Sequence, residues 1–134
     1  MKIIHIIAKV LLSLICILPV TGLLGIFPEP TRDLYHTDAA FAFIQLMMQS
    51  AQYIDYMMVG VLLGACVALW TKREALGALL ITPITANVVG FHLFLDGGLL
   101  NPGSIPALVM LVTNGYLLYA NRELYTQLLK GTSK

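Results

Sequence analysis

The sequence alternates between long apolar stretches and short polar ones. A helix needs about 20 mainly apolar residues to cross the hydrocarbon core of a bilayer. Residues 3–27, 75–95 and 105–120 each form an apolar run of roughly that length, and residues 39–70 form a run too long for a single span. The pattern predicts four membrane-spanning helices, one of which lies within the longest run.

The longest run divides into two parts. Gln45, Gln49 and Gln52 recur at spacings that place them on one face of a helix. We therefore expect an amphipathic segment over about 39–51, near the membrane surface or against the bundle, and a span over about 53–71. The alternative is one long, tilted helix whose glutamine face contacts its neighbours. The first interpretation is favoured.

Polar segments separate the apolar runs, and the first and last of them are rich in proline or glycine. They are FPEPTRDLYHTD (27–38), TKRE (71–74) and DGGLLNPGS (96–104), and such residues end helices. The first run could also be a cleaved signal peptide, but Lys9 interrupts it and no A-x-A-like site follows. We expect it to be retained as a span.

The composition supports the same class. Of 134 residues, 58% are hydrophobic and 11% are charged, against roughly 25% charged residues in a soluble domain. So few charges cannot cover a water-facing surface. The sequence predicts an all-α membrane protein: four transmembrane helices in an antiparallel bundle that form a single integral membrane domain over residues 1–134.

The basic residues predict the orientation. Four spans place the N-terminus, residues 71–74 and the C-terminus on one side, and that side collects seven of the eight basic residues. By the positive-inside rule both termini are cytoplasmic, and a bacterial inner membrane is the expected location. A net charge of +1 without a basic stripe argues against a nucleic-acid partner. The seven are Lys2, Lys9, Lys72, Arg73, Arg122, Lys130 and Lys134.

Polar residues gather at the outer ends of two spans. His92 and Asp96 lie four residues apart at the end of the third span, and Asp55 and Tyr56 open the second span on the same side. Two interpretations stay open. The residues cap helix ends, or they form a shared polar pocket, with Gln52, for proton exchange or quinone binding. The sequence predicts no metal site, because too few ligands accompany His92.

Other residues suit contacts between helices. Asn114 lies in the middle of the fourth span and Asn87 within the third, where an amide usually bonds to a neighbouring helix. Gly60 and Gly64 form a small-xxx-small match that would allow close packing.

The second half of the chain resembles DoxX-like membrane proteins. The similarity lies in Pro83, Asn87, the FHLFLD element (91–96) and the aromatic-rich stretch 116–122, and GLLGIFPEP (22–30) adds to it. It implies a four-helix membrane bundle, and some relatives are associated with quinone-linked redox systems. Two positions depart from the family pattern. Thr21 and Gly22 stand where many relatives have Asn-Lys, and Tyr56 stands where relatives often have glutamate.

Two functional hypotheses follow. The first is an accessory subunit of a quinone-linked redox system, with quinone as the implied cofactor. The second is a non-enzymatic membrane anchor or assembly partner, with a protein partner in a membrane complex or a second copy of the chain. No nucleotide loop or nucleophile–base pair is present. We therefore assign no catalytic residue and do not expect an enzyme by itself. A carrier is disfavoured because no inverted repeat is visible.

Overall fold

Four long apolar helices form the body of the protein. The structure is a computed structural model and describes residues 2–130. The four are α1 (Lys2–Leu23), α3 (Gln52–Leu69), α4 (Glu74–Gly90) and α5 (Ile105–Ala120). α4 continues through a π-helical turn, η2 (Phe91–Leu95), and the 3₁₀ turn η3 (Pro102–Ser104) precedes α5. All four are long and apolar enough to cross a membrane. The protein is an integral membrane protein with four spans, as predicted.

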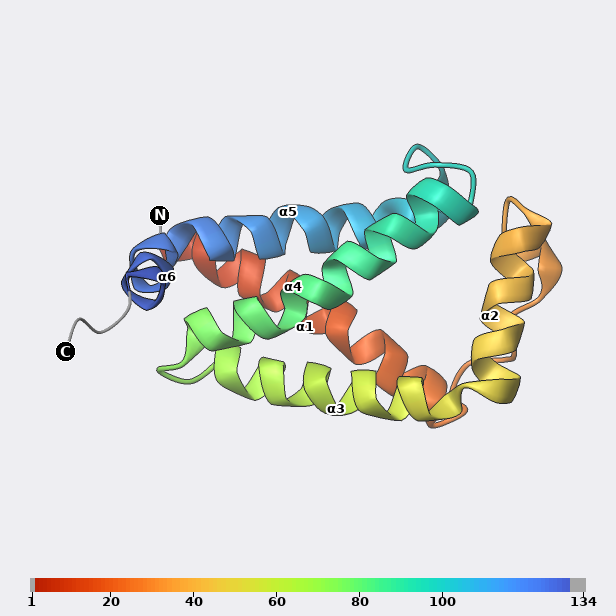
Figure 1. Cartoon of the computed structure of the whole chain (residues 1–134), viewed down its shortest axis with the longest axis horizontal. Helices are drawn as coiled ribbons and strands as arrows, with labels where there is room; N and C mark the ends of the chain where they lie inside the picture. The colour runs from red at the N-terminus through yellow and green to blue at the C-terminus, as the bar shows by residue number, and fades with distance from the viewer. Residues whose placement is uncertain (1, 131–134) are drawn as a thin grey trace.

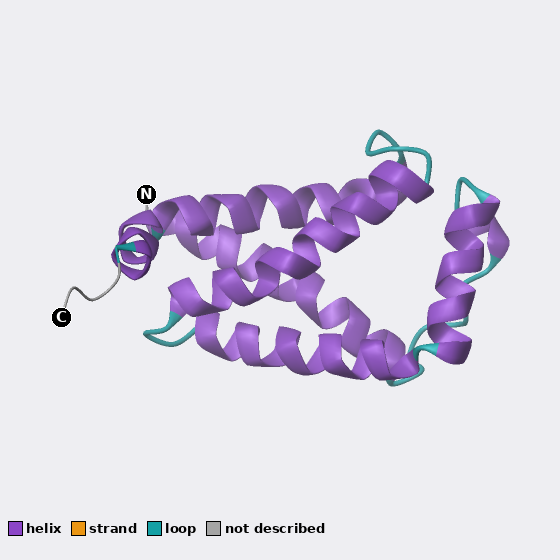
Figure 2. Ribbon diagram, viewed as in Figure 1, coloured by secondary structure: helices purple, strands orange, loops and turns teal. Residues whose placement is uncertain are grey.

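The spans form an antiparallel ring. α1 packs against α3 and α5, and α4 packs against the same two helices, so every neighbouring pair runs in opposite directions (Figures 1 and 2). The start of α1, the end of α5 and the 70–73 turn lie at one end of the bundle, which we call the basic end. The connectors 24–37 and 96–101 lie at the other end, which we call the cap end. The predicted four-helix antiparallel bundle is confirmed.

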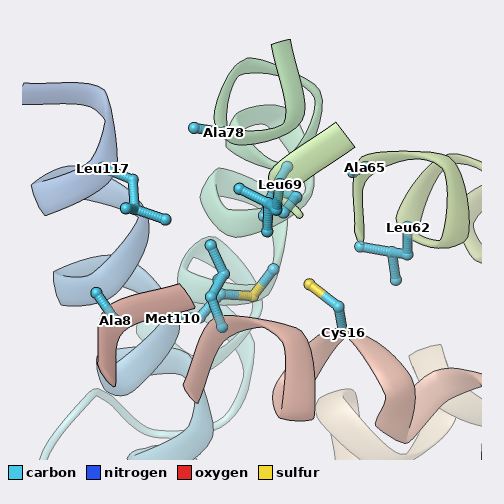
Figure 3. Packing of buried hydrophobic residues seen from close by; sticks show 10 residues of the cluster. Ala8, Cys16, Leu62, Ala65, Leu69, Ala78, Met110 and Leu117 are labelled. Atoms are coloured by element: carbon cyan, nitrogen blue, oxygen red, sulfur yellow. The ribbon is translucent and has the colours of Figure 1, made fainter. Parts of the chain in front are cut away.

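A small core holds the helices together (Figure 3). Leu12 of α1, Leu62 of α3 and Leu117 of α5 are almost fully buried, with Ala65, Ala78 and Met110 beside them. Many larger apolar side chains instead point outward, among them Ile3, Val67 and Val112. This distribution suits a bundle whose outer surface contacts lipid, because the hydrocarbon shields those apolar side chains from water.

A separate helix, α2 (Asp38–Ser50), precedes the second span. Ala51, with φ −129° and ψ 26°, leaves the helical conformation and separates α2 from α3. α2 lies across the cap end, whereas α3 runs along the bundle (Figure 1). Thr37 caps its start by accepting a hydrogen bond from the Ala40 N–H at 3.0 Å. The separate amphipathic segment is confirmed, and the single long helix is wrong.

The first helix is shorter than predicted. It ends at Leu23, four residues before the expected end at residue 27. Gly25 adopts a φ of 68°, and the N–H of Ile26 bonds back to the Thr21 carbonyl at 3.1 Å. This is a Schellman-type C-cap, which glycine favours because it has no Cβ. Residues 24–27 are apolar, yet they begin the connector.

Close helix approach occurs at a different glycine from the two predicted. A Cβ at Gly77 of α4 would lie 2.8 Å from the Ala65 carbonyl oxygen and 2.8 Å from the Leu69 nitrogen. A Cβ at Gly60 or Gly64 would meet no heavy atom within 4 Å. Gly77 therefore sets the α3–α4 packing, and the packing role predicted for Gly60 and Gly64 has no counterpart inside the described bundle.

Candidate functional site

Asp96 is the centre of a hydrogen-bonded cap. Its side chain is almost fully buried, and Oδ1 accepts the backbone N–H of His36 at 2.8 Å. Nδ1 of His92 lies 2.9 Å from Oδ2. The carboxylate thus joins the end of the third span to the 24–37 connector, which is 60 residues away in sequence. Burial and, next, the charge of Asp96 raise the pKa of the nearby Tyr35 phenol.

The 96–104 connector is folded around polar side chains. Nδ2 of Asn101 donates to the Asp96 carbonyl at 3.2 Å and to the Gly98 carbonyl at 2.6 Å. Its Oδ1 accepts the Ser104 N–H at 2.9 Å. Gly97 and Gly98 have φ values of 80° and 110°, which side chains with a Cβ rarely adopt. The two glycines of the DGG sequence therefore provide the backbone conformation that the turn requires.

The π-helical turn η2 orients His92 and Asp96. The Asp96 N–H bonds to the Phe91 carbonyl at 3.1 Å, one residue wider than an α-helical bond. Thr37 Oγ1 donates to the Leu95 carbonyl, which the wider turn leaves available. The predicted contact of His92 with Asp96 is present, and it belongs to a structure that closes the cap end.

The predicted polar pocket divides into two places. Asp55, Tyr56 and Gln52 do not join the Asp96 cap but line a cavity of about 300 Å³ between α1, α2 and α3. Asp55 also lines a second cavity of about 350 Å³ between α2, α3 and α4, together with Asn87 and Val88. Asp55 therefore stands between two cavities, whereas His92 and Asp96 line neither.

The second cavity, which we call the Asp55 cavity, has mostly apolar walls. Phe43 of α2 and Phe91 of η2 lie with ring centroids 5.8 Å apart. Asp55 and the exposed Asn87 are its polar side chains. An aromatic pair, flexible thioethers and two hydrogen-bonding groups suit a flat, lipophilic molecule that carries oxygen atoms. The remaining wall residues are Ile44, Met47, Met48, Met58 and Val88.

Asn114 lies inside the bundle. Its side chain is almost fully buried, and Nδ2 lies 3.2 Å from Oγ1 of Thr85 and 3.3 Å from Oγ1 of Thr82, both on α4. Within the described residues its Oδ1 has no hydrogen-bond partner. The amide links α5 to α4 and lines none of the cavities described above.

A second carboxylate cluster lies at the basic end, and the sequence analysis missed it. Glu74 begins α4 and lies 2.9 Å from Nε2 of His5 and 3.2 Å from Nζ of Lys9, both on α1. Nδ2 of Asn121 donates to Oε1 of Glu74 at 2.9 Å. Lys9, which interrupts the first apolar run, therefore has a carboxylate partner. A lysine within an apolar run indicates that a partner is needed, but the identity of that partner depends on how α1 and α4 align.

The short helix α6 (Arg122–Leu129) is fixed beside this cluster. The Tyr125 hydroxyl donates to the Ala75 carbonyl at 2.7 Å, and its pKa is raised by burial and, next, by the charge of Glu74. The basic end is thus held by charged and aromatic side chains from α1, α4 and α6.

Residues 2–130 contain no group of three or more histidine, cysteine or acidic side chains that could hold a metal ion.

Comparisons of the chain with protein-family models, with curated proteins and with solved structures find no match.

Proposed function

We propose that this protein binds a quinone in the Asp55 cavity and acts as an accessory subunit of a quinone-linked redox system. The observation that carries the proposal is the cavity itself. It is an apolar space of about 350 Å³ whose polar groups are Asp55 and Asn87. Ligand cavities of this kind combine apolar walls with a few polar groups that fix orientation.

A quinone headgroup fits this chemistry. Its flat ring suits the wall formed by Phe43 and Phe91, and its isoprenoid tail suits the surrounding lipid. The Asn87 amide can donate to a carbonyl oxygen, and Asp55 offers a second polar group on the opposite helix. The resemblance to DoxX-like proteins noted in the sequence implies the same ligand class, although no family model matches the chain. The chemistry that a quinone supplies is reversible transfer of electrons and protons, and this chain contributes binding and orientation.

The site differs from the pocket centred on His92 that the sequence suggested. His92 and Asp96 are engaged with the cap, so we assign them a structural role. Tyr56 and Gln52 line the neighbouring cavity, which the half-buried Asp55 also lines. They are the second group of residues whose replacement tests the proposal.

The test is quinone binding by the purified protein in nanodiscs. A short-chain benzoquinone is titrated, and unfolding temperature reports binding, because a ligand that binds only the folded state raises stability with its concentration. An alkylbenzene of equal length, which lacks the carbonyl oxygens, is the ligand control. We expect stabilisation by the quinone and little by the hydrocarbon.

Asn87→Leu is the decisive variant and Gln49→Leu its matched control. Both replace an amide with an apolar side chain, but Gln49 lines neither cavity. Loss of one hydrogen bond of about 1.4 kcal/mol weakens binding about tenfold in Asn87→Leu. Equal weakening in both variants, or no stabilisation of the unaltered protein by any quinone, would refute the proposal and favour the membrane-anchor hypothesis.

A further inference from the structure

A separate cavity of about 520 Å³ opens at the basic end of the bundle, between α1 and the junction of α5 and α6. We call it the basic-end cavity. Lys2 and His5 line it on one side and Arg122 on the other, with Tyr116 and Tyr119 between them. Ile6 adds an apolar wall toward the membrane-spanning part of α1. The cavity lies at the opposite end of the bundle from the Asp55 cavity and has the opposite charge character.

No carboxylate among residues 2–130 neutralises Lys2 or Arg122 in this cavity. Neither Lys2 nor Arg122 forms an ion pair with a carboxylate in the described part of the chain. Glu74, the acidic group nearest in the network, is engaged with His5 and Lys9. Glu123 follows Arg122 in sequence, but it does not line the cavity. Two cations thus face a common space without a counter-ion from residues 2–130.

Aromatic contacts position two of the side chains that line the cavity, Arg122 and His5. The Arg122 guanidinium lies 4.4 Å from the centroid of the Tyr119 ring, and its Nη1 donates to the Tyr119 carbonyl at 3.2 Å. His5 packs edge-on against Tyr116, with ring centroids 5.9 Å apart. Because Arg122 already contacts Tyr119, the guanidinium loses less conformational freedom when an anion binds it.

The position of the cavity at the end of the bundle indicates the source of the anion. α6 is seen nearly end-on in Figure 1 while α5 runs across the view, so α6 lies crosswise at the end of the bundle. It exposes Leu124, Leu128 and Leu129, as expected of a helix at a membrane surface. Ile6 is 54% exposed, so an acyl chain can continue from the cavity along α1.

We infer that the basic-end cavity binds the headgroup phosphate of an anionic phospholipid from the leaflet at that end, which the positive-inside pattern predicts to be cytoplasmic. Basic pockets between spans on that side are suited to anionic headgroups. Lys2 and Arg122 provide the charge, the tyrosines provide the walls, and Ile6 contacts the lipid chain. A free phosphate would use the charges but not the apolar wall.

The test is lipid retention by the full chain. The protein is reconstituted with an equal mixture of phosphatidylglycerol and phosphatidylcholine, extracted in mild detergent and examined by native mass spectrometry. We expect one phosphatidylglycerol retained and no comparable retention of phosphatidylcholine. Lys2→Gln/Arg122→Gln should lower retention at least tenfold. Lys72→Gln/Arg73→Gln is the matched control, because it removes the same charge from the same end but from residues outside the cavity.

Further variants and competitors make the result decisive. Ala120→Phe fills the cavity without changing its charge and should also release the lipid. Circular dichroism is used to check that each variant stays helical. If the Lys2→Gln/Arg122→Gln variant loses its helical structure, the result for Ala120→Phe decides the test. Equal loss in both double variants would show general attraction to the basic end and overturn the inference. Displacement of the lipid by millimolar inorganic phosphate or glycerol 3-phosphate would also overturn it, in favour of a soluble phosphate.

Discussion

Asp96 and Glu74 lie at opposite ends of the same span, and each gathers hydrogen bonds from segments distant in sequence. Asp96 accepts a backbone N–H from the 24–37 connector and contacts a histidine on its own helix. Glu74 contacts a histidine and a lysine of α1 and an amide that follows α5. The Asp96 side chain is 2% exposed, whereas the Glu74 side chain is 18% exposed.

The difference separates two ways of closing a helical bundle. At the cap end, one buried carboxylate fixes a loop, and the cavity nearby is apolar with Asp55 at its edge. At the basic end, a carboxylate offsets cations of α1, and further cations remain beside it. The cap end therefore suits a neutral lipophilic ligand, and the basic end suits an anionic lipid. The predictions below test each half of this contrast.

Asp96→Ala should have the largest effect on stability. It removes the acceptor of the His36 N–H and the partner of His92, and the loss of a buried charged acceptor costs about 3 kcal/mol. The free energy of unfolding in bicelles measures it. Asp38→Ala is the control, because that carboxylate is at the same end but 93% exposed. Equal destabilisation by both variants would contradict a specific cap.

Gly77→Ala should be next, and it tests how the basic end is held. The added Cβ would lie 2.8 Å from backbone atoms of α3, so the helices must separate. Overpacking of this kind costs about 2–3 kcal/mol. Gly64→Ala meets no heavy atom within 4 Å, and alanine is the better helix former. We expect Gly64→Ala to keep or raise the unfolding temperature, and a fall equal to that of Gly77→Ala would refute the assigned close approach.

In the Glu74 cluster, replacing Glu74 should lower stability more than replacing Lys9. Glu74→Ala leaves the half-buried Lys9 without a carboxylate partner and should lower stability by about 2 kcal/mol. Lys9→Met should cost less than 1 kcal/mol, because Glu74 keeps His5 and Asn121. In the double variant part of the Glu74→Ala loss should be recovered. Additive losses in this double-mutant cycle would show that the two side chains do not interact.

The sequence predicts the spans well because their signal is local. A membrane helix is defined by the length of one apolar run. Gln45 and Gln49 lie on α2 as expected, whereas Gln52, expected on the same helical face, begins α3. The contact of His92 with Asp96 is also local, because four residues separate the two along one helix. Helix ends are less predictable. Residues 24–27 are apolar, and only the positive φ of Gly25 shows that α1 has already ended.

The candidate site depends on contacts between distant segments, so less of it follows from sequence. Asp96 meets His36 across 60 residues, and Glu74 meets His5 across 69. These pairings require the alignment of helices and the π-helical turn at 91–95. Asp55 and Asn87 were both singled out, but as members of different groups. The structure places them on one cavity because α3 and α4 are neighbours there.

His92→Ala should have a small effect on stability, and it separates the cap from the ligand site most sharply. It removes one contact to Asp96 but leaves the His36 hydrogen bond, so stability should fall by about 1 kcal/mol. Quinone affinity should stay within twofold, because His92 does not line the Asp55 cavity. Thermal unfolding and the quinone titration are measured on the same sample. Loss of quinone binding with unchanged stability would bring His92 into the ligand site, directly or through the Phe91 ring, which it contacts edge-on at a centroid distance of 5.2 Å.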